Sequence, residues 1–362
     1  MAAMAKNEGQ WAPDWATHPG EHLAEYLEVF GWNQAEFARL AGLSTKLVST
    51  IINGANPVTP ETAIKIERVL GVKANIWVGL QANWDLFQAH QDEKDSPSTK
   101  SWLSQFPIRE LKARGCLPDT TDQGVLLDII LRLFGIGTTA AYEEKVKGLA
   151  VQHRQSKAHK SLPSHVFTWL MLGEKRAREL KLREYNPERF KQGLSEIRSL
   201  TVAEPSVFEP RMKEICSGAG VALIFEPPLS KTCLFGSARW IEGNRAIIQM
   251  SLRMRSNDHF WWTFFHEAAH IVLHRGRNFM DDENGVGDGA EEEADQWAKE
   301  LLVGQARFEA LKALRPRSKE QIVSFAREIN LHPGILVGMM QHERILPFTH
   351  LNGLKARFEL VA

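Results

Sequence analysis

The spacing of hydrophobic and polar residues predicts a chain that is mainly helical, with a few strands in its second half. Over residues 18–90, apolar side chains recur three and four positions apart, and turn residues divide the stretch into five helices. Residues 220–225, 232–241 and 244–252 are instead short apolar runs of the length of strands. We therefore expect an α+β fold, mainly helical, with a small sheet toward its C-terminal end.

Changes in this pattern predict the domain boundaries. Residues 91–101 are charged, interrupted by a proline and free of large apolar side chains, so they predict a linker after an N-terminal domain at 18–90. Residues 102–204 have helical spacing throughout and predict a helical middle region of about five helices. Residues 205–362 contain the predicted strands and form the C-terminal domain.

The composition argues against secretion and against a membrane protein. The 362 residues contain 44 basic and 44 acidic side chains, so no net charge draws the whole chain to nucleic acid or to a membrane. The three cysteines lack a Cys-x-x-Cys pair and indicate reduced thiols. The first 20 residues have no apolar signal core, and no run approaches the ~18 apolar residues of a membrane span. We expect a cytoplasmic protein without a membrane partner.

The most informative chemistry lies in the apolar segment 264–274, which contains a His-Glu-x-x-His motif. Residues four apart share one face of a helix, so His266 and His270 can present their imidazoles to one point, with Glu267 beside it. Two neutral imidazoles suit Zn²⁺, and the neighbouring carboxylate can take a proton from a metal-bound water. The motif predicts a zincin-like site with Glu267 as its catalytic base.

A second helical pattern at 289–302 supplies the remaining ligand. Glu291 and Asp295 are four apart on one side of it, so Glu291 can complete a site of two histidines and one carboxylate. Asp295 would then accept a hydrogen bond from the second nitrogen of a ligand imidazole. Glu292 or Glu293 as the ligand would leave Asp295 facing elsewhere.

Two features of this site stay open from the sequence. His274 continues the face of the two histidines but lies two turns from His266, roughly 12 Å along the helix, which is too far to ligate the same ion. His274 is therefore expected either to contact a ligand histidine on the side away from the metal or to belong to the core. Mn²⁺ or Fe²⁺ could also occupy a site of this composition.

The strand at 246–252, the motif helix and the Glu-x-x-x-Asp helix together resemble the ImmA/IrrE metallopeptidases, over roughly residues 205–350. The resemblance implies a gluzincin-like peptidase that cuts DNA-binding repressors. It implies His266, His270 and Glu291 as zinc ligands and Glu267 as general base. The three tyrosines, Tyr26, Tyr142 and Tyr185, lie outside this region, so a histidine (His332, His342 or His350) or an arginine would have to stabilise the oxyanion.

Residues 31–54 predict a helix, a tight turn and a second helix. Asn33 and Ser44 are suited to cap the two helices, and Gly42 permits the left-handed residue that ends the first. On the second helix one face is small and polar, as a recognition helix in a major groove requires. That face consists of Thr45, Lys46, Ser49 and Thr50.

This stretch resembles the helix-turn-helix of the Xre family and, within it, the HigA-type antitoxins. The likeness rests on His18-Pro19-Gly20-Glu21, on Ile52-Asn53-Gly54 and on residues 77–81. It implies a homodimer on palindromic operator DNA, with Gln34 at a phosphate and Thr45, Lys46, Ser49 and Thr50 near bases. Residues 1–90 contain six Lys/Arg against nine Asp/Glu, so binding would depend on a few oriented contacts and on dimerisation.

The two halves together predict a cytoplasmic transcriptional regulator with a built-in zinc endopeptidase. Its protein substrate would be a repressor- or antitoxin-type partner, or the chain itself near residues 92–100. The alternative is a HigA-like antitoxin and autorepressor that neutralises a cognate toxin. In that case the zincin-like domain is a non-catalytic sensor or partner-binding module.

Overall fold

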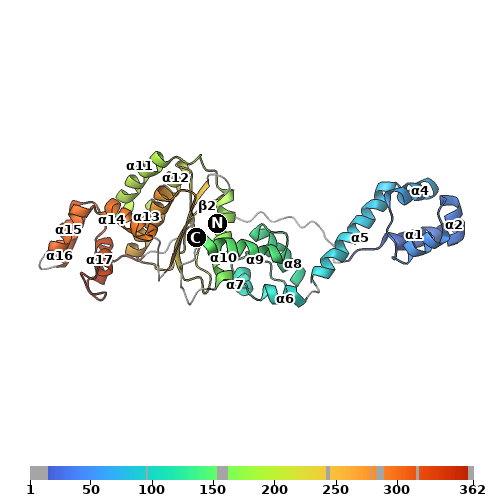
Figure 1. The fold of residues 1–362 in the computed structure, drawn as a ribbon, viewed down its shortest axis with the longest axis horizontal. Helices are drawn as coiled ribbons and strands as arrows, with labels where there is room; N and C mark the ends of the chain where they lie inside the picture. The colour runs from blue at the N-terminus through green and yellow to red at the C-terminus, as the bar shows by residue number, and fades with distance from the viewer. Residues whose placement is uncertain are drawn as a thin grey trace. The chain divides into compact units, whose positions relative to one another are not determined.

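The computed structural model describes residues 15–94, 97–152, 162–241, 245–277, 279–282, 289–314 and 318–357. These residues form two compact units, each described by itself (Figure 1). The first unit is drawn from Met1–Ser101 and Thr121–Leu127, and the second from Trp102–Thr120 and Asp128–Ala362. The α+β, mainly helical class that the sequence predicts is confirmed.

The first unit begins with the five predicted helices. They are α1 (Pro19–Phe30), α2 (Gln34–Ala41), α3 (Thr45–Ile52), α4 (Pro60–Leu70) and α5 (Ala74–Lys94). The predicted caps are present, since the side chains of Asn33 and Ser44 accept hydrogen bonds from the backbone N–H groups of Glu36 and Leu47. Gly42 ends α2 at a φ of 62°, the left-handed conformation that glycine adopts without strain. A core that includes Phe37, Val48, Ile51 and Trp77 holds these helices together.

The predicted linker at 91–101 is wrong for most of its length. Helix α5 continues to Lys94, and α6 (Pro97–Leu103) starts within the same stretch, while Asp95 and Ser96 lie outside the described residues. A long-range contact explains the error, because Lys94 forms a 2.6 Å ion pair with Asp122, 28 residues further along the chain. Local composition does not reveal such a partner.

The second unit is built around a four-stranded sheet in the order β1-β3-β2-β4. The strands are β1 (Val221–Phe225), β2 (Leu234–Ile241), β3 (Arg245–Met250) and β4 (Phe279–Asp282). Strand β1 runs parallel to β3, and β2 is antiparallel to both β3 and β4. The first three confirm the predicted strands, whereas the short edge strand β4 did not stand out in the sequence.

The helices of the second unit follow in chain order. They are α7 (Ile108–Ala113), α8 (Gln123–Phe134, which begins in the first unit), α9 (Thr139–Gln152), α10 (Pro163–Glu179), α11 (Pro187–Ser199), α12 (Pro205–Gly218), α13 (Asn257–Leu273), α14 (Ala290–Leu302), α15 (Gln305–Ala313), α16 (Lys319–Glu328) and α17 (Pro333–His342), with 3-10 turns η1 (Leu200–Val202) and η2 (Asn352–Leu354).

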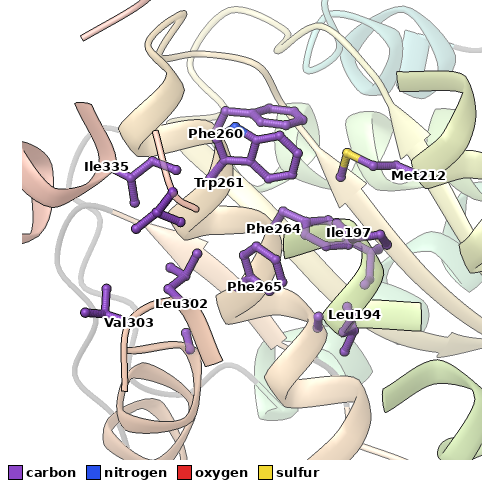
Figure 2. Close-up of a cluster of buried hydrophobic side chains, with 14 of the residues drawn as sticks. Leu194, Ile197, Met212, Phe260, Trp261, Phe264, Phe265, Leu302, Val303 and Ile335 are labelled. Carbon is purple, nitrogen blue, oxygen red and sulfur yellow. The ribbon is translucent and has the colours of Figure 1, made fainter. Parts of the chain in front are cut away.

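Both faces of the sheet are covered, and the alternation along β1 shows it. Ala222 and Ile224 pack with Ala177 of α10 on one face, whereas Val221 and Leu223 belong to the main core on the other. Helix α13 lies in that main core, where its side chains meet residues from α11, α12 and α14, as Figure 2 shows for Phe264, Phe265, Leu194, Ile197, Met212 and Leu302.

This packing corrects the predicted boundary between residues 204 and 205. The five helices α7 to α11 of the predicted middle region exist, but α10 packs on β1 and β3, and α11 packs on α12 and α13. The described residues of 102–204 and 205–362 therefore do not separate into two domains at that point. Helical periodicity shows that a face is buried but does not identify the element that buries it.

One apolar stretch also differs from the expectation. In the described residues, Gln123–Val146 is long and apolar enough, by length and composition alone, to cross a membrane. In the structure a turn at Gly135 divides the stretch into α8 and α9. The prediction that no run approaches that length therefore fails by length and composition, although neither α8 nor α9 alone is that long.

Candidate metal centre and nucleic-acid interface

The two histidines of the motif lie on α13 and face the start of α14. His266 and His270 are 4 % and 1 % exposed, and their Nε2 atoms are 3.0 Å apart. This proximity follows from the helix, on which residues four apart are neighbours, and from the surrounding aromatic core, which fixes the rotation of α13.

Glu291, in the first turn of α14, completes the cluster. Its Oε2 atom lies 3.0 Å from Nε2 of His266 and 3.5 Å from Nε2 of His270. One ligand atom from each of these three residues lies within 4.8 Å of the others, which is close enough to hold one metal ion. In the described part of the chain, this is the group that meets that condition. The structure thus brings together the three residues that the sequence predicted.

Asp295 fixes the tautomer of His266. Its Oδ1 atom lies 2.8 Å from Nδ1 of His266, and a carboxylate only accepts, so Nδ1 carries the proton. With a metal bound and the ring neutral, Nε2 of His266 would then offer its lone pair to the ion; without one, that nitrogen lies within hydrogen-bond distance of Oε2 of Glu291. The predicted role of Asp295 as the outer partner of a ligand imidazole agrees with this geometry.

His274 does the same for His270, which is one of the two roles expected for it, through a contact with Glu293 that the sequence did not reveal. Oε2 of Glu293 lies 3.0 Å from Nε2 of His274, so that nitrogen donates. Nδ1 of His274 is then the acceptor for Nδ1 of His270, 3.1 Å away. In this arrangement His270 would also offer a lone pair on Nε2 to a metal ion. The i, i+4 spacing of His270 and His274 was visible in the sequence, but the pairing with Glu293 was not.

The electrostatics favour the metal-binding forms of these groups. Burial lowers the pKa of His270 to about 4, so its ring is neutral at pH 7. Burial alone would raise the pKa of Glu291, but hydrogen bonds with His266 and His270 outweigh it and lower that pKa. Two imidazole nitrogens and one carboxylate oxygen converge, and a metal ion at their centre would take the place of the hydrogen bonds that the imidazoles make with Glu291. This donor set fits a divalent metal such as Zn²⁺.

Glu267 follows His266 on α13 and is 0 % exposed. It lies against strand β2, because a Cβ added at Gly236 would be 2.5 Å from its Oε1 atom. The structure therefore places the predicted base at the boundary between the motif helix and the sheet.

The residues considered for the oxyanion are mostly engaged elsewhere. His332 caps α17 and contacts Asn257, and the ring of His342 packs near Trp262. Tyr185 is distant in the sequence, yet its hydroxyl donates to the carbonyl of Ile271 on α13 at 3.4 Å. No pattern in the sequence indicates that contact.

The predicted DNA-contacting residues lie on the first unit. Thr45 and Lys46 are exposed on α3, while Ser49, Thr50 and Gln34 (the first residue of α2) are half-buried. The hydroxyl of Thr50 lies 3.0 Å from the carbonyls of Lys46 and Leu47, so its proton is directed to its own helix. Sequence reasoning passed over Asn53, which is exposed at the end of α3 and is spaced at i+4 from Ser49.

Comparison with known proteins places the similarity in this first unit. A family model described as Helix-turn-helix (HTH_3) matches residues 23–77. The chain is 33 % identical over 73 residues to the uncharacterized HTH-type transcriptional regulator YddM of Escherichia coli (strain K12), covering 20 % of this chain and 78 % of that protein. It is 32 % identical over 80 residues to virulence-associated protein I of Dichelobacter nodosus, covering 22 % of this chain and 74 % of that protein.

Two solved structures are also similar over part of the chain. A putative antidote protein of a plasmid maintenance system from Nostoc punctiforme is 35 % identical, with 22 % of this chain and 88 % of that chain covered and a TM-score of 0.22. The Pseudomonas aeruginosa antitoxin HigA, solved with the higBA promoter, is 29 % identical, with 22 % and 87 % covered and a TM-score of 0.22.

Proposed function

The chain belongs to the helix-turn-helix family of transcriptional regulators through residues 23–77, and we propose that it couples operator binding to a zinc-dependent endopeptidase in its second unit. The single observation that carries the peptidase half is the convergence of His266, His270 and Glu291, with Glu267 adjacent on the same helix. The resemblance of residues 205–350 to ImmA/IrrE metallopeptidases supports it.

The DNA-binding half rests on α2 and α3. We propose that a homodimer binds a palindromic operator in the cytoplasm, with Gln34 at a phosphate and Thr45, Lys46 and Ser49 near bases. Support comes from the exposed polar face of α3 and from the similarity to HTH-type regulators. Because residues 1–90 carry more acidic than basic side chains, DNA binding would depend on a few well-placed basic residues. Lys46 is exposed on α3 and is one of them.

In the second unit, His266, His270 and Glu291 would hold Zn²⁺, or Mn²⁺ in its place. When bound, the metal would polarise a water molecule and a peptide carbonyl. The Glu267 carboxylate would accept a proton from the attacking water and return it to the leaving amine. Asp295 and His274 would keep the two imidazoles in the ligating tautomer.

One observation favours the alternative, in which this unit is a non-catalytic sensor or partner-binding module of a HigA-like antitoxin. Glu267 is 0 % exposed and its neighbour His266 is 4 % exposed. A peptide must reach this carboxylate for hydrolysis, whereas a sensor needs only the metal.

The deciding experiment uses the purified full chain with ZnCl₂ or MnCl₂. Cleavage of the chain itself, of small helix-turn-helix regulators and of any toxin encoded beside it is followed by mass spectrometry. Glu267→Gln should abolish cleavage while metal content and operator binding persist. The matched control is Glu292→Gln, which alters an exposed carboxylate of α14 and should behave as wild type.

Metal analysis separates the two halves of the proposal. His270→Ala should lose the bound ion, because it removes one of three ligands. If every cleavage product persists in Glu267→Gln, the peptidase proposal is wrong. If no product forms in the wild type while metal removal changes operator affinity, the sensor alternative replaces it.

A further inference from the structure

Strand β2 passes α13 at very close range beside the proposed base. A Cβ atom built on Gly236 would lie 2.5 Å from Oε1 of Glu267 and 2.8 Å from its Cγ atom. It would also lie 2.8 Å from Cγ2 of Thr263, one turn earlier on α13. Carbon atoms in proteins pack at about 3.5–4.0 Å, so no side chain larger than hydrogen fits here without displacing one of these groups.

The pairing of β2 with β4 shifts register between Leu234 and Gly236, so the strand is irregular next to this position. Gly236 does not have a left-handed φ, and it sits within the sheet, opposite Met250 of β3 and Asp281 of β4. Glycine in a strand interior weakens the strand and marks either a bulge or a close approach of another group. At Gly236 both are present, and the close approach is that of Glu267 and Thr263 of α13.

Two of the three obstructing atoms belong to the Glu267 side chain, which is more flexible than the β-branched Thr263. Glu267 is 0 % exposed, and its carboxylate, more than the strand or the helix, would yield to a methyl group at 236. Ala238, the next residue of β2 on the same face, is also 0 % exposed and packs in the main core. Because this core is closely packed, the strand cannot shift away from α13.

We propose that Gly236 is a positioning residue for the reaction: the absence of its side chain fixes the place of the Glu267 carboxylate beside the metal ligands. The inference rests on the proposed peptidase function. Gly236 touches neither substrate nor metal, and it acts only through Glu267.

The kinetic test is Gly236→Ala in the full chain. Because a misplacement of about 1 Å can cost 10²-fold in rate, we expect kcat to fall roughly 100-fold while KM and metal content stay at wild-type values. The matched control is Ala238→Gly, which removes a methyl group from the same face of β2. It should lower Tm without changing kcat. Cleavage by Gly236→Ala at the wild-type rate would overturn the inference.

A stability cycle tests the same inference without any activity. Every protein in the cycle carries Thr263→Ser, which removes the obstructing Cγ2 atom of Thr263. The melting temperature is measured with and without Gly236→Ala, once with Glu267 present and once with Glu267→Ala. The drop in Tm caused by Gly236→Ala should be much smaller once Glu267 is truncated. Equal drops in the two backgrounds would refute the positioning role.

The two tests keep the inference and the proposed function apart. If the wild type cleaves nothing, the peptidase proposal falls and the cycle alone decides the role of Gly236. If Gly236→Ala does not fold, recovery of the fold by Glu267→Ala supports the inference. Failure to recover it counts against the inference.

Discussion

Helices α3 and α13 both carry a functional motif, yet they treat its polar residues in opposite ways. On α3, Thr45 and Lys46 are exposed to solvent and contribute little to the packing of the core. On α13, His266, Glu267 and His270 are buried within the largest core, and each imidazole is held by a partner from another turn or helix. The exposed polar face of α3 is thus separable from stability, whereas the cluster that could hold a metal is part of the fold.

The largest effect that would sharpen this comparison is removal of the metal. Chelation by 1,10-phenanthroline should lower the Tm of the second unit by about 10 °C, because a ligand at 1,000 times its Kd contributes about 4 kcal/mol. The two imidazoles and the Glu291 carboxylate would then lose the ion proposed to hold them together. The Tm of the first unit should not change. Differential scanning calorimetry of the full chain checks both, and a uniform shift of the two transitions would contradict the comparison.

An intermediate effect is expected from Asp295→Asn. The amide cannot enforce the proton on Nδ1 of His266, so zinc affinity should fall about 10- to 100-fold. Competition with a fluorescent chelator measures it. Glu292→Gln serves as the isosteric control on the same helix, and equal affinities for both variants would show that the contact to His266 has no influence on the metal.

The smallest effect on stability should come from Lys46→Gln. An exposed lysine on α3 contributes little to folding, so the free energy of unfolding should change by less than about 0.5 kcal/mol. Operator affinity should weaken because Lys46 is proposed to lie near bases, and since its charge also lies in the field of the phosphates, the slope of log K against log salt should drop by up to about 1. Fluorescence anisotropy at several salt concentrations reports this, with Lys73→Gln, which alters a lysine paired with Glu67, as control. An unchanged slope together with a large loss of stability would reverse the roles assigned to the two helices.

The parts of the site that could be predicted are those fixed by local periodicity. The spacing of His266 and His270, and the i, i+4 relation of Glu291 and Asp295, are enough to place each pair on one helical face. Aromatic and aliphatic flanks indicate that α13 is buried. In the first unit, capping residues mark the helix starts within a residue.

What escaped prediction depends on contacts between distant parts of the chain. The pairing of His274 with Glu293, the hydrogen bond from Tyr185 to Ile271 and the approach of Gly236 to Glu267 join residues that are 19 to 86 positions apart in the sequence. The sheet-covering role of α10 and the ion pair that extends α5 are of the same kind. To predict any of these contacts, one must know which faces of the helices and strands pack against each other.

The unbroken run of α5 to Lys94 has a consequence for self-processing. An extended peptide can pair with an exposed strand edge, so the proposed peptidase would take its substrate as an extended chain. Residues 92–94 instead form the last turn of a helix whose end is paired with Asp122. If the proposed peptidase cuts there, that turn must first unwind. The cleavage rate would then depend on how often the ion pair between Lys94 and Asp122 breaks, and a variant with a frayed helix end would be the better substrate at an unaltered scissile sequence.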